Sequence, residues 1–443
     1  MGSKAPLGIP PAPPSLAQAS WYWLKLGCTS FGGPAAQISM LHTELVERRR
    51  WIGEQRFLHA LNYAMLLPGP EAQQLATYLG WLLHGVWGGV LAGALFVLPS
   101  LVVMCALAWS YMAFSSLPLV AAIFYGIKPA VTAVVLMAAY RVGRRSLRNG
   151  YLVAIAVLAF AALTLARLPF PLVVVGAALL GMLGGRVRPQ AFTTTAAHPA
   201  SAQAAPAVID DATPLPPHAR FRWGRLFAVV GVLVGLWAAT LAGLAWRWGW
   251  SGTLTQMGWF FSQMAMVTFG GAYAVLPHVM QGAVAQYGWL TQGQMIDGLA
   301  LGETTPGPLI MVVAFVGFLG GWHTAVLSDA PMLSGIAGAC VATFFTFLPS
   351  FLFILVGGPL VERTRNVAAV TAPLVAITAA VVGVILNLAV VFAGHVFWPS
   401  GWPAPFDGRA ALIAVVALVA LARFKLGIIP VFILAGFAGV LGS

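Results

Sequence analysis

Apolar residues run along this chain in long unbroken stretches, not in the alternating pattern that is typical of exposed strands. The stretches approach the ~20 residues that a membrane-spanning helix needs. Because every backbone polar group must be paired inside lipid, helices are the expected structure. We predict nine plain helices, near 87–113, 117–140, 151–167, 170–186, 225–246, 333–357, 367–393, 409–424 and 427–442. The predicted fold class is therefore an all-α polytopic membrane protein.

Glycine and proline interrupt the apolar pattern at four places, and these interruptions form a motif that occurs twice. The first copy is Phe31-Gly32-Gly33, Trp51 and Pro68-Gly69-Pro70, and the second is Phe269-Gly270-Gly271, Trp289 and Pro306-Gly307-Pro308. The three landmarks share one offset, since 269 − 31, 289 − 51 and 306 − 68 all equal 238. We therefore predict two homologous repeats, at 16–186 and 254–443.

The remaining segments define the predicted domain organisation. Residues 1–15 form a flexible tail, and residues 187–222, rich in proline, alanine and threonine, form a flexible cytoplasmic linker. Residues 223–247 form a linking transmembrane helix that has no counterpart in the first repeat. One extra span between two equal repeats makes the second repeat enter from the opposite side, which predicts inverted repeats.

Charge is sparse and lies mainly in loops. Only 8% of residues are charged, against roughly 25% in a soluble domain, and the formal net charge is +12. Most arginines follow the positive-inside rule, so we expect no nucleic-acid partner and a cytoplasmic N-terminus and linker. The loop 44–56 has four arginines, whereas its counterpart 282–292 has none. This difference favours nine full spans with four re-entrant segments, although thirteen simple spans remain an alternative.

The breaks suggest an anion site. Pro34 and Pro70 follow glycine, and proline suits the first turn of a new helix. A helix that begins inside the membrane presents free N–H groups and a positive dipole to the cavity that it faces. Paired interruptions in two halves are a pointer to a transporter's binding site. The alternative is that the motifs are only kinks or sites of tight packing.

Few ionisable residues lie inside the apolar sequence, and each is a candidate functional group because burying charge in lipid is costly. Lys25 and Lys128 could bind an anion, or their side chains could extend to the membrane surface. Glu71 directly follows the first Pro-Gly-Pro and could carry a proton or cap its helix. Glu303 precedes the second Pro-Gly-Pro and has Met65 at the matching place, so the repeats are not equivalent.

Neutral polar residues gather at the same breaks. Gln37, Thr304 and Thr305 could donate hydrogen bonds to an oxyanion, or they could hold helices together. The histidines do not have the spacing of a metal site, and no phosphate-binding loop occurs, so we expect no cofactor and no enzyme activity. Cys28, Cys105 and Cys340 are interpreted as buried small apolar residues.

The duplicated motif resembles the chromate ion transporter (CHR) family in its long, two-domain form. Thr29-Ser30-Phe31-Gly32-Gly33-Pro34 and Leu67-Pro68-Gly69-Pro70 carry the resemblance, together with the second copy. It implies a multi-pass protein of the bacterial inner membrane that exports chromate, with proton antiport as a proposed coupling. The second half departs from the pattern, since Ala272 stands where Pro34 does and Leu309 where Glu71 does. Substrate, protons, lipid and a second copy of the chain are the candidate partners.

The predicted substrate site combines the breaks with the charged and polar residues beside them. Sulfate or another oxyanion, and an anion channel in place of a carrier, are the alternative functions. The complete set of candidate residues is Lys25, Phe31, Gly32, Gly33, Pro34, Gln37, Pro68, Gly69, Pro70, Glu71, Lys128, Gly270, Gly271, Glu303, Thr304, Thr305, Pro306, Gly307 and Pro308.

Overall fold

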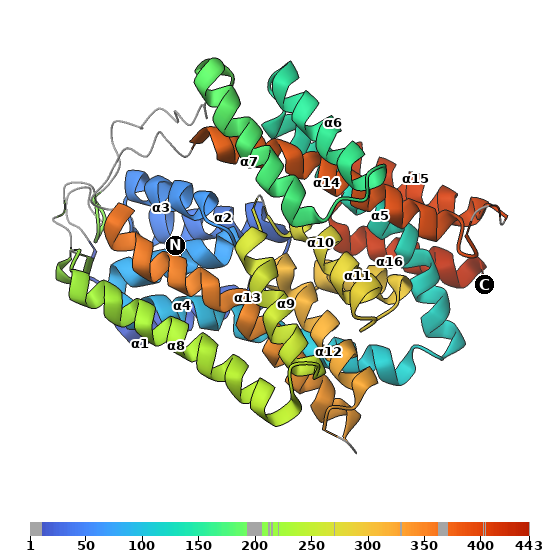
Figure 1. Cartoon of the computed structure of the whole chain (residues 1–443), viewed down its shortest axis with the longest axis horizontal. Helices are drawn as coiled ribbons and strands as arrows, with labels where there is room; N and C mark the ends of the chain where they lie inside the picture. The colour runs from blue at the N-terminus through green and yellow to red at the C-terminus, as the bar shows by residue number, and fades with distance from the viewer. Residues whose placement is uncertain are drawn as a thin grey trace, which may run out of the picture.

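A computed structural model describes residues 11–192, 206–210, 213, 216–219, 221–269, 271–327, 330–361, 371–401, 403 and 405–442. In these residues the regular structure is helical, with one isolated β-bridge, which confirms the predicted all-α class (Figure 1). The α-helices are α1 (Leu16–Thr29), α2 (Gly33–His42), α3 (Glu54–Leu66), α4 (Glu71–Phe114), α5 (Pro118–Ser146), α6 (Gly150–Thr164), α7 (Phe170–Val187), α8 (Trp223–Trp248), α9 (Thr253–Val267), α10 (Ala272–Met280), α11 (Gln292–Thr304), α12 (Val312–Thr324), α13 (Pro331–Val361), α14 (Thr371–Phe397), α15 (Gly408–Ala422) and α16 (Ile428–Gly442).

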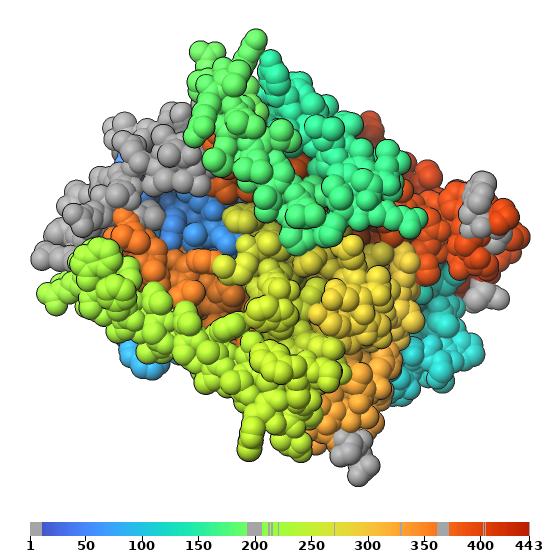
Figure 2. Space-filling view, in the orientation of Figure 1, coloured from blue at the N-terminus to red at the C-terminus, as the bar shows by residue number. Residues whose placement is uncertain are grey.

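The long helices have the length and composition of membrane spans. Within the described part of the chain, six helices are long and apolar enough to cross a membrane, namely α4, α5, α7, α8, α13 and α14. Helix α8 lies on the outside of the bundle, and Leu241 is its one buried residue (Figure 2). An exposed apolar surface of this kind is what lipid covers. The interpretation of the cysteines as buried is wrong for two of them, because Cys28 and Cys340 are exposed.

Hydrogen-bond contacts show which segments of the chain lie at each of the two ends of the bundle. At the end near the predicted linker, His84 Nε2 lies 2.9 Å from Pro14 O and His218 Nε2 lies 3.1 Å from Leu82 O. At the opposite end, Trp248 Nε1 donates to Val326 O at 3.3 Å. Helix α8 connects the two ends, since its first turn is near His218 and its last is at Trp248.

Helix α4 is a hairpin and not one continuous helix. His84 and Gly85 have non-helical backbone angles, with φ +65° at Gly85. Gly80 and Gly88 pack backbone to backbone, and Thr77 packs on Gly93, so residues 71–83 run antiparallel to residues 86–114. The chain therefore enters along α3, turns at Pro68-Gly69-Pro70 and returns to the linker end at His84.

Helices α12 and α13 form the matching hairpin in the second half. Gly317 packs against Gly338, and Gly321 packs against Ser334, which again is an antiparallel register. Its turn lies at the opposite end, beside Trp248. His323 Nδ1, in the last turn of α12, is 2.9 Å from Trp289 O, so the loop before α11 lies at that end too. The segment of α3 and residues 71–83 thus has both of its ends at the linker end, and the segment of α11 and α12 has both of its ends at the opposite end. This is the geometry that a re-entrant segment requires.

The predicted linker is packed against the bundle where the structure describes it. Ile52 and Ile209 form the β-bridge, Gly53 N donates to Ile209 O at 2.8 Å, and Ile209 is buried. Residues 206–210 are therefore fixed on the loop before α3, whereas the sequence predicted a flexible linker throughout 187–222. Residues 193–205 lie outside the described part of the chain.

Candidate functional site

The four breaks lie at the turns between α1 and α2, α3 and α4, α9 and α10, and α11 and α12, and each of these pairs is a hairpin with the break at its tip. The tips meet in the interior at two places, which we call the first and second crossing. The first crossing consists of Ser30, Gln37, Ser100 and Gly307. Gly307 N donates to Ser30 O at 2.8 Å, and Gln37 Nε2 donates to Gly307 O at 2.6 Å. Thus the first Phe-Gly-Gly break is bonded to the second Pro-Gly-Pro break.

The second crossing has the reciprocal pairing and consists of Gly69, Gln74, Thr268 and Ser350. Gly69 N donates to Thr268 O at 2.7 Å, and Gln74 Nε2 lies 3.4 Å from Ser350 Oγ. Thr268 directly precedes the second Phe-Gly-Gly break, and Gly69 is in the first Pro-Gly-Pro break. Each crossing therefore joins a hairpin from the linker end to a hairpin from the opposite end.

Glycine is required at both crossings for two reasons. Gly69 has φ +129° and Gly307 has φ +95°, which L side chains rarely adopt. A Cβ on Gly69 would also lie 2.5 Å from Ser350 Oγ, and one on Gly307 would lie 2.7 Å from Ser100 Cβ. The serines come from the sequences Leu98-Pro99-Ser100 and Leu348-Pro349-Ser350, which match between the repeats.

The helices that follow the breaks begin without side-chain caps. Among the described residues, no side chain caps α2 after Gly32, α4 after Pro70 or α10 after Gly271. The same holds for the 3₁₀ turn Leu309–Met311, which follows Pro308 and leads into α12. The first backbone N–H groups of these helices are therefore free of side-chain acceptors, which favours an anion at the breaks.

Several buried polar atoms at the crossings lack a protein partner. Among the described residues, this applies to the hydroxyls of Ser30 and Ser100 and to the amide oxygens of Gln37 and Gln74. All four side chains are fully buried. An unsatisfied buried polar group costs about 1–3 kcal/mol, so a ligand or water that pairs with these atoms would be stabilising. The hydroxyls can donate to an oxyanion, and the amide oxygens can accept from water.

The two carboxylates lie beside the breaks in different surroundings. Glu71 is the first residue of α4, where the helix dipole favours negative charge. Glu303 is buried near the end of α11 and accepts a hydrogen bond from the hydroxyl of Tyr273 on α10. Tyr273 was not among the predicted site residues, although it follows the second Phe-Gly-Gly by only two residues.

Lys128 is bonded away from the crossings. Its Nζ lies 3.4 Å from Asp297 Oδ2, and the Tyr111 hydroxyl donates to the same oxygen at 2.9 Å. Asp297 is 2% exposed, so water has little access to the carboxylate of this ion pair. The ion pair and the Tyr111 hydrogen bond connect α5 and α4 of the first half to α11 of the second half. Lys128 therefore does not present a free cation to the breaks.

The remaining predicted residues differ in their surroundings. Lys25 is exposed on α1 beside the exposed Trp21, and Phe31 is 40% exposed next to Gly32, Gly33 and Pro34. The hydroxyls of Thr304 and Thr305 donate to carbonyls of their own helix, so their one donor is used. Pro68 O accepts from Gln74 Nε2, and Pro306 is half-buried. Gly270 lies outside the described residues.

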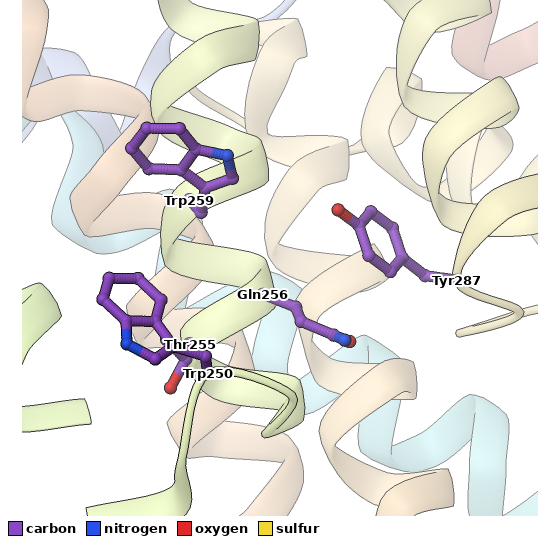
Figure 3. A pocket seen from close by; sticks show the side chains of 5 residues that line it. All are labelled: Trp250, Thr255, Gln256, Trp259 and Tyr287. Atoms are coloured by element: carbon purple, nitrogen blue, oxygen red, sulfur yellow. The ribbon is translucent and has the colours of Figure 1, made fainter. Parts of the chain in front are cut away.

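A surface pocket near the start of α9 is separate from the crossings. It is lined by Trp250, Thr255, Gln256, Trp259 and Tyr287, as Figure 3 shows. Residues 255–259 are at the N-terminal end of α9, whereas Thr268 at its C-terminal end joins the second crossing. The pocket therefore lies about 13–20 Å along the helix from the break, given a rise of about 1.5 Å per residue.

The fold and the crossings define a multi-pass helical membrane protein of the transporter class. The chain belongs to the chromate transporter family, whose pattern matches residues 17–182 and 255–440. A chromate transport protein of Pseudomonas aeruginosa is 33% identical over 437 residues, covering 97% of this chain and 93% of that protein. A chromate transport protein of Cupriavidus metallidurans is 30% identical over 411 residues, covering 93% and 89%. No solved structure matches the chain.

Proposed function

We propose that the chain exports chromate from the cytoplasm and that the dianion passes between the two crossings. The observation that carries this proposal is the reciprocal bonding of the breaks, Ser30 with Gly307 and Thr268 with Gly69. This pairing brings the uncapped helix starts of both halves toward the centre of the bundle. The names of the relatives, which are chromate transport proteins, support chromate as the substrate.

The proposed topology has two inverted repeats, 16–186 and 254–443, with re-entrant hairpins that enter from opposite faces of the inner membrane. The linker end is cytoplasmic in this proposal, because the arginine-rich segments at 144–148 and 186–188 are near it. Pro14, before α1, contacts His84 at the linker end, whereas Trp248, before α9, contacts Val326 at the opposite end. The first two hairpins thus begin and end at one end of the bundle and the next two at the other, which supports the inversion.

Membrane potential is the proposed driving force. Each elementary charge that moves across 100 mV is worth about 2.3 kcal/mol, so export of a dianion from a negative interior is favoured by about 4.6 kcal/mol. Proton antiport would add to this through Glu71 or Glu303. Uptake of labelled chromate into everted vesicles by the Glu71→Gln variant tests the proton-carrier role, since an intact rate with unchanged pH dependence would exclude it.

Sulfate transport is the second candidate within the same class, because sulfate matches chromate in charge and shape. Everted vesicles that contain the wild-type chain should take up labelled chromate, and unlabelled sulfate should compete weakly. Equal uptake of the two anions would contradict the substrate assignment. Measurement with and without an imposed proton gradient separates potential-driven export from antiport.

A further inference from the structure

The two crossings are built from corresponding residues of the repeats, but their hydroxyl groups differ in hydrogen bonding. Ser30 of the first crossing corresponds to Thr268 of the second, since 268 − 30 equals the repeat offset of 238. Ser100 corresponds to Ser350, because each ends a Leu-Pro-Ser sequence. Each crossing thus contains one hydroxyl residue beside a Phe-Gly-Gly break and one that packs on the glycine of a Pro-Gly-Pro break.

At the second crossing both hydroxyls already have protein partners. Thr268 Oγ1 donates to Met264 O at 2.7 Å, in the last turn of α9. Ser350 Oγ accepts from Gln74 Nε2 at 3.4 Å. The side-chain atom of this crossing that lacks a partner in the described chain is Gln74 Oε1, an acceptor that cannot donate to an anion.

At the first crossing two hydroxyls are unpaired around one glycine. Among the described residues, Ser30 Oγ and Ser100 Oγ have no partner, although both side chains are 0% exposed. Ser30 is held beside Gly307 by the bond from Gly307 N to Ser30 O at 2.8 Å. Ser100 Oγ lies 2.9 Å from the position that a Cβ on Gly307 would occupy. Both hydroxyls therefore have a hydrogen to donate at the same place.

Charge at the helix starts favours the same crossing. Glu71 follows the Pro-Gly-Pro of the second crossing, so a carboxylate already occupies the positive start of α4. Leu309 holds the corresponding place at the first crossing, where it begins the uncapped 3₁₀ turn. Glu303 precedes Gly307 by one turn, but its carboxylate is bonded to Tyr273 on α10, which begins at the break of the second crossing. The helix start at the first crossing can therefore face an anion.

We propose that the first crossing is the substrate site, where the hydroxyls of Ser30 and Ser100 donate to two oxygens of the oxyanion, and that the second crossing holds the two halves together. This inference rests on the proposed oxyanion transport and assigns the residues that bind the anion. A hydrogen bond to a charged acceptor is stronger than one to a neutral acceptor, and a tetrahedral oxyanion offers an oxygen to each hydroxyl. The bound anion also pairs two buried hydroxyls that the protein leaves unpaired.

Uptake of labelled chromate and labelled sulfate into everted vesicles is the first test. Ser30→Ala and Ser100→Ala should each raise the apparent KM about 10-fold or more, which corresponds to the loss of a hydrogen bond to a charged group. The repeat-related variants Thr268→Val and Ser350→Ala should leave the apparent KM near the wild-type value. Ser110→Ala is the matched control, since it removes a hydroxyl from the same helix as Ser100, about 15 Å further along.

Thermal unfolding in detergent is the second test, and it separates binding from structure. Without substrate, Ser30→Ala and Ser100→Ala should not lower the midpoint, because each removes a buried hydroxyl without a protein partner. Thr268→Val should lower it, because its hydroxyl is bonded to the last turn of α9. Added chromate should raise the midpoint of the wild type and of Thr268→Val, and should raise it less in the two serine variants.

The outcomes separate this inference from the proposed function. If the wild type transports chromate and the Ser30 and Ser100 variants match Ser110→Ala, the substrate site is wrong and the proposed transport stands. If Thr268→Val and Ser350→Ala raise the KM as much as the other two variants, both crossings hold the anion and the inference is again wrong. If sulfate alone is transported with the same serine dependence, the site stands and the chromate assignment fails. If the wild type transports neither anion, both proposals fall.

Discussion

Replacement of Gly307 by alanine tests whether the first crossing needs its observed backbone and its close serine. The residue has φ +95°, where an L side chain costs about 1–2 kcal/mol. The new methyl carbon would lie 2.7 Å from Ser100 Cβ and 2.9 Å from Ser100 Oγ. Overpacking of this kind costs about 1–3 kcal/mol, so the crossing should be destabilised by about 2–5 kcal/mol in all.

The overpacking cost depends on Ser100, whereas the cost of the backbone conformation does not. The double variant Gly307→Ala with Ser100→Gly should therefore lose the overpacking cost and keep the backbone cost. Glycine in a helix costs about 1 kcal/mol by itself, so the rescue should be partial. Gly176→Ala is the control, because a methyl group there in α7 meets no atom within 4 Å.

Two measurements follow the effect. Thermal unfolding of the purified protein in detergent should show a lower midpoint for Gly307→Ala than for Gly176→Ala, and chromate uptake into everted vesicles should fall strongly. A Gly307→Ala protein with the stability and uptake of Gly176→Ala would refute the argument that the two halves meet closely at this glycine. A double variant without any gain would refute the assigned clash with Ser100.

Three further predictions follow from other contacts. Lys128→Met leaves the buried Asp297 carboxylate unpaired and should cost about 3–5 kcal/mol in thermal unfolding, whereas the double variant with Asp297→Leu should recover most of it. Tyr273→Phe removes the hydrogen bond to Glu303 and should lower chromate uptake, with a larger effect than Tyr151→Phe on the surface. Burial holds the pKa of His218 below its ordinary value of 6.5. The unfolded chain then binds the proton more readily, so stability should be full above pH 6.5 and should fall as the pH drops below it. Thermal unfolding between pH 7.5 and 5 should show this loss, and a His218→Gln variant with an equal loss would contradict it.

The plain helices could be predicted from the sequence because apolar length is a local property. The predicted helix near 225–246 is α8 (Trp223–Trp248), and the one near 427–442 is α16 (Ile428–Gly442). The constant 238-residue offset also indicated where the breaks lie. The turn inside α4 at Gly85 separates residues 71–83 from the longer apolar helix 86–114, and the plain helix predicted near 87–113 begins just after this turn.

The pairing of the breaks could not be predicted from the sequence. Ser30 and Gly307 are 277 residues apart, and nothing in either motif indicates which break bonds to which. Ser100 and Ser350 were visible only as matching parts of the repeats, since their approach to Gly307 and Gly69 depends on the packing of hairpins from different halves. Lys128 looked like a free cation because its partner Asp297 is far along the chain.

Counterflow of labelled chromate in proteoliposomes tests the central claim most directly. The purified chain should exchange internal labelled chromate faster when unlabelled chromate is present outside, because a carrier whose site is at the crossings returns loaded. The Gly69→Ala and Gly307→Ala variants should lose this exchange, and Gly176→Ala should keep it. Chromate flux without acceleration by external chromate, or exchange that survives in both crossing variants, would contradict the account.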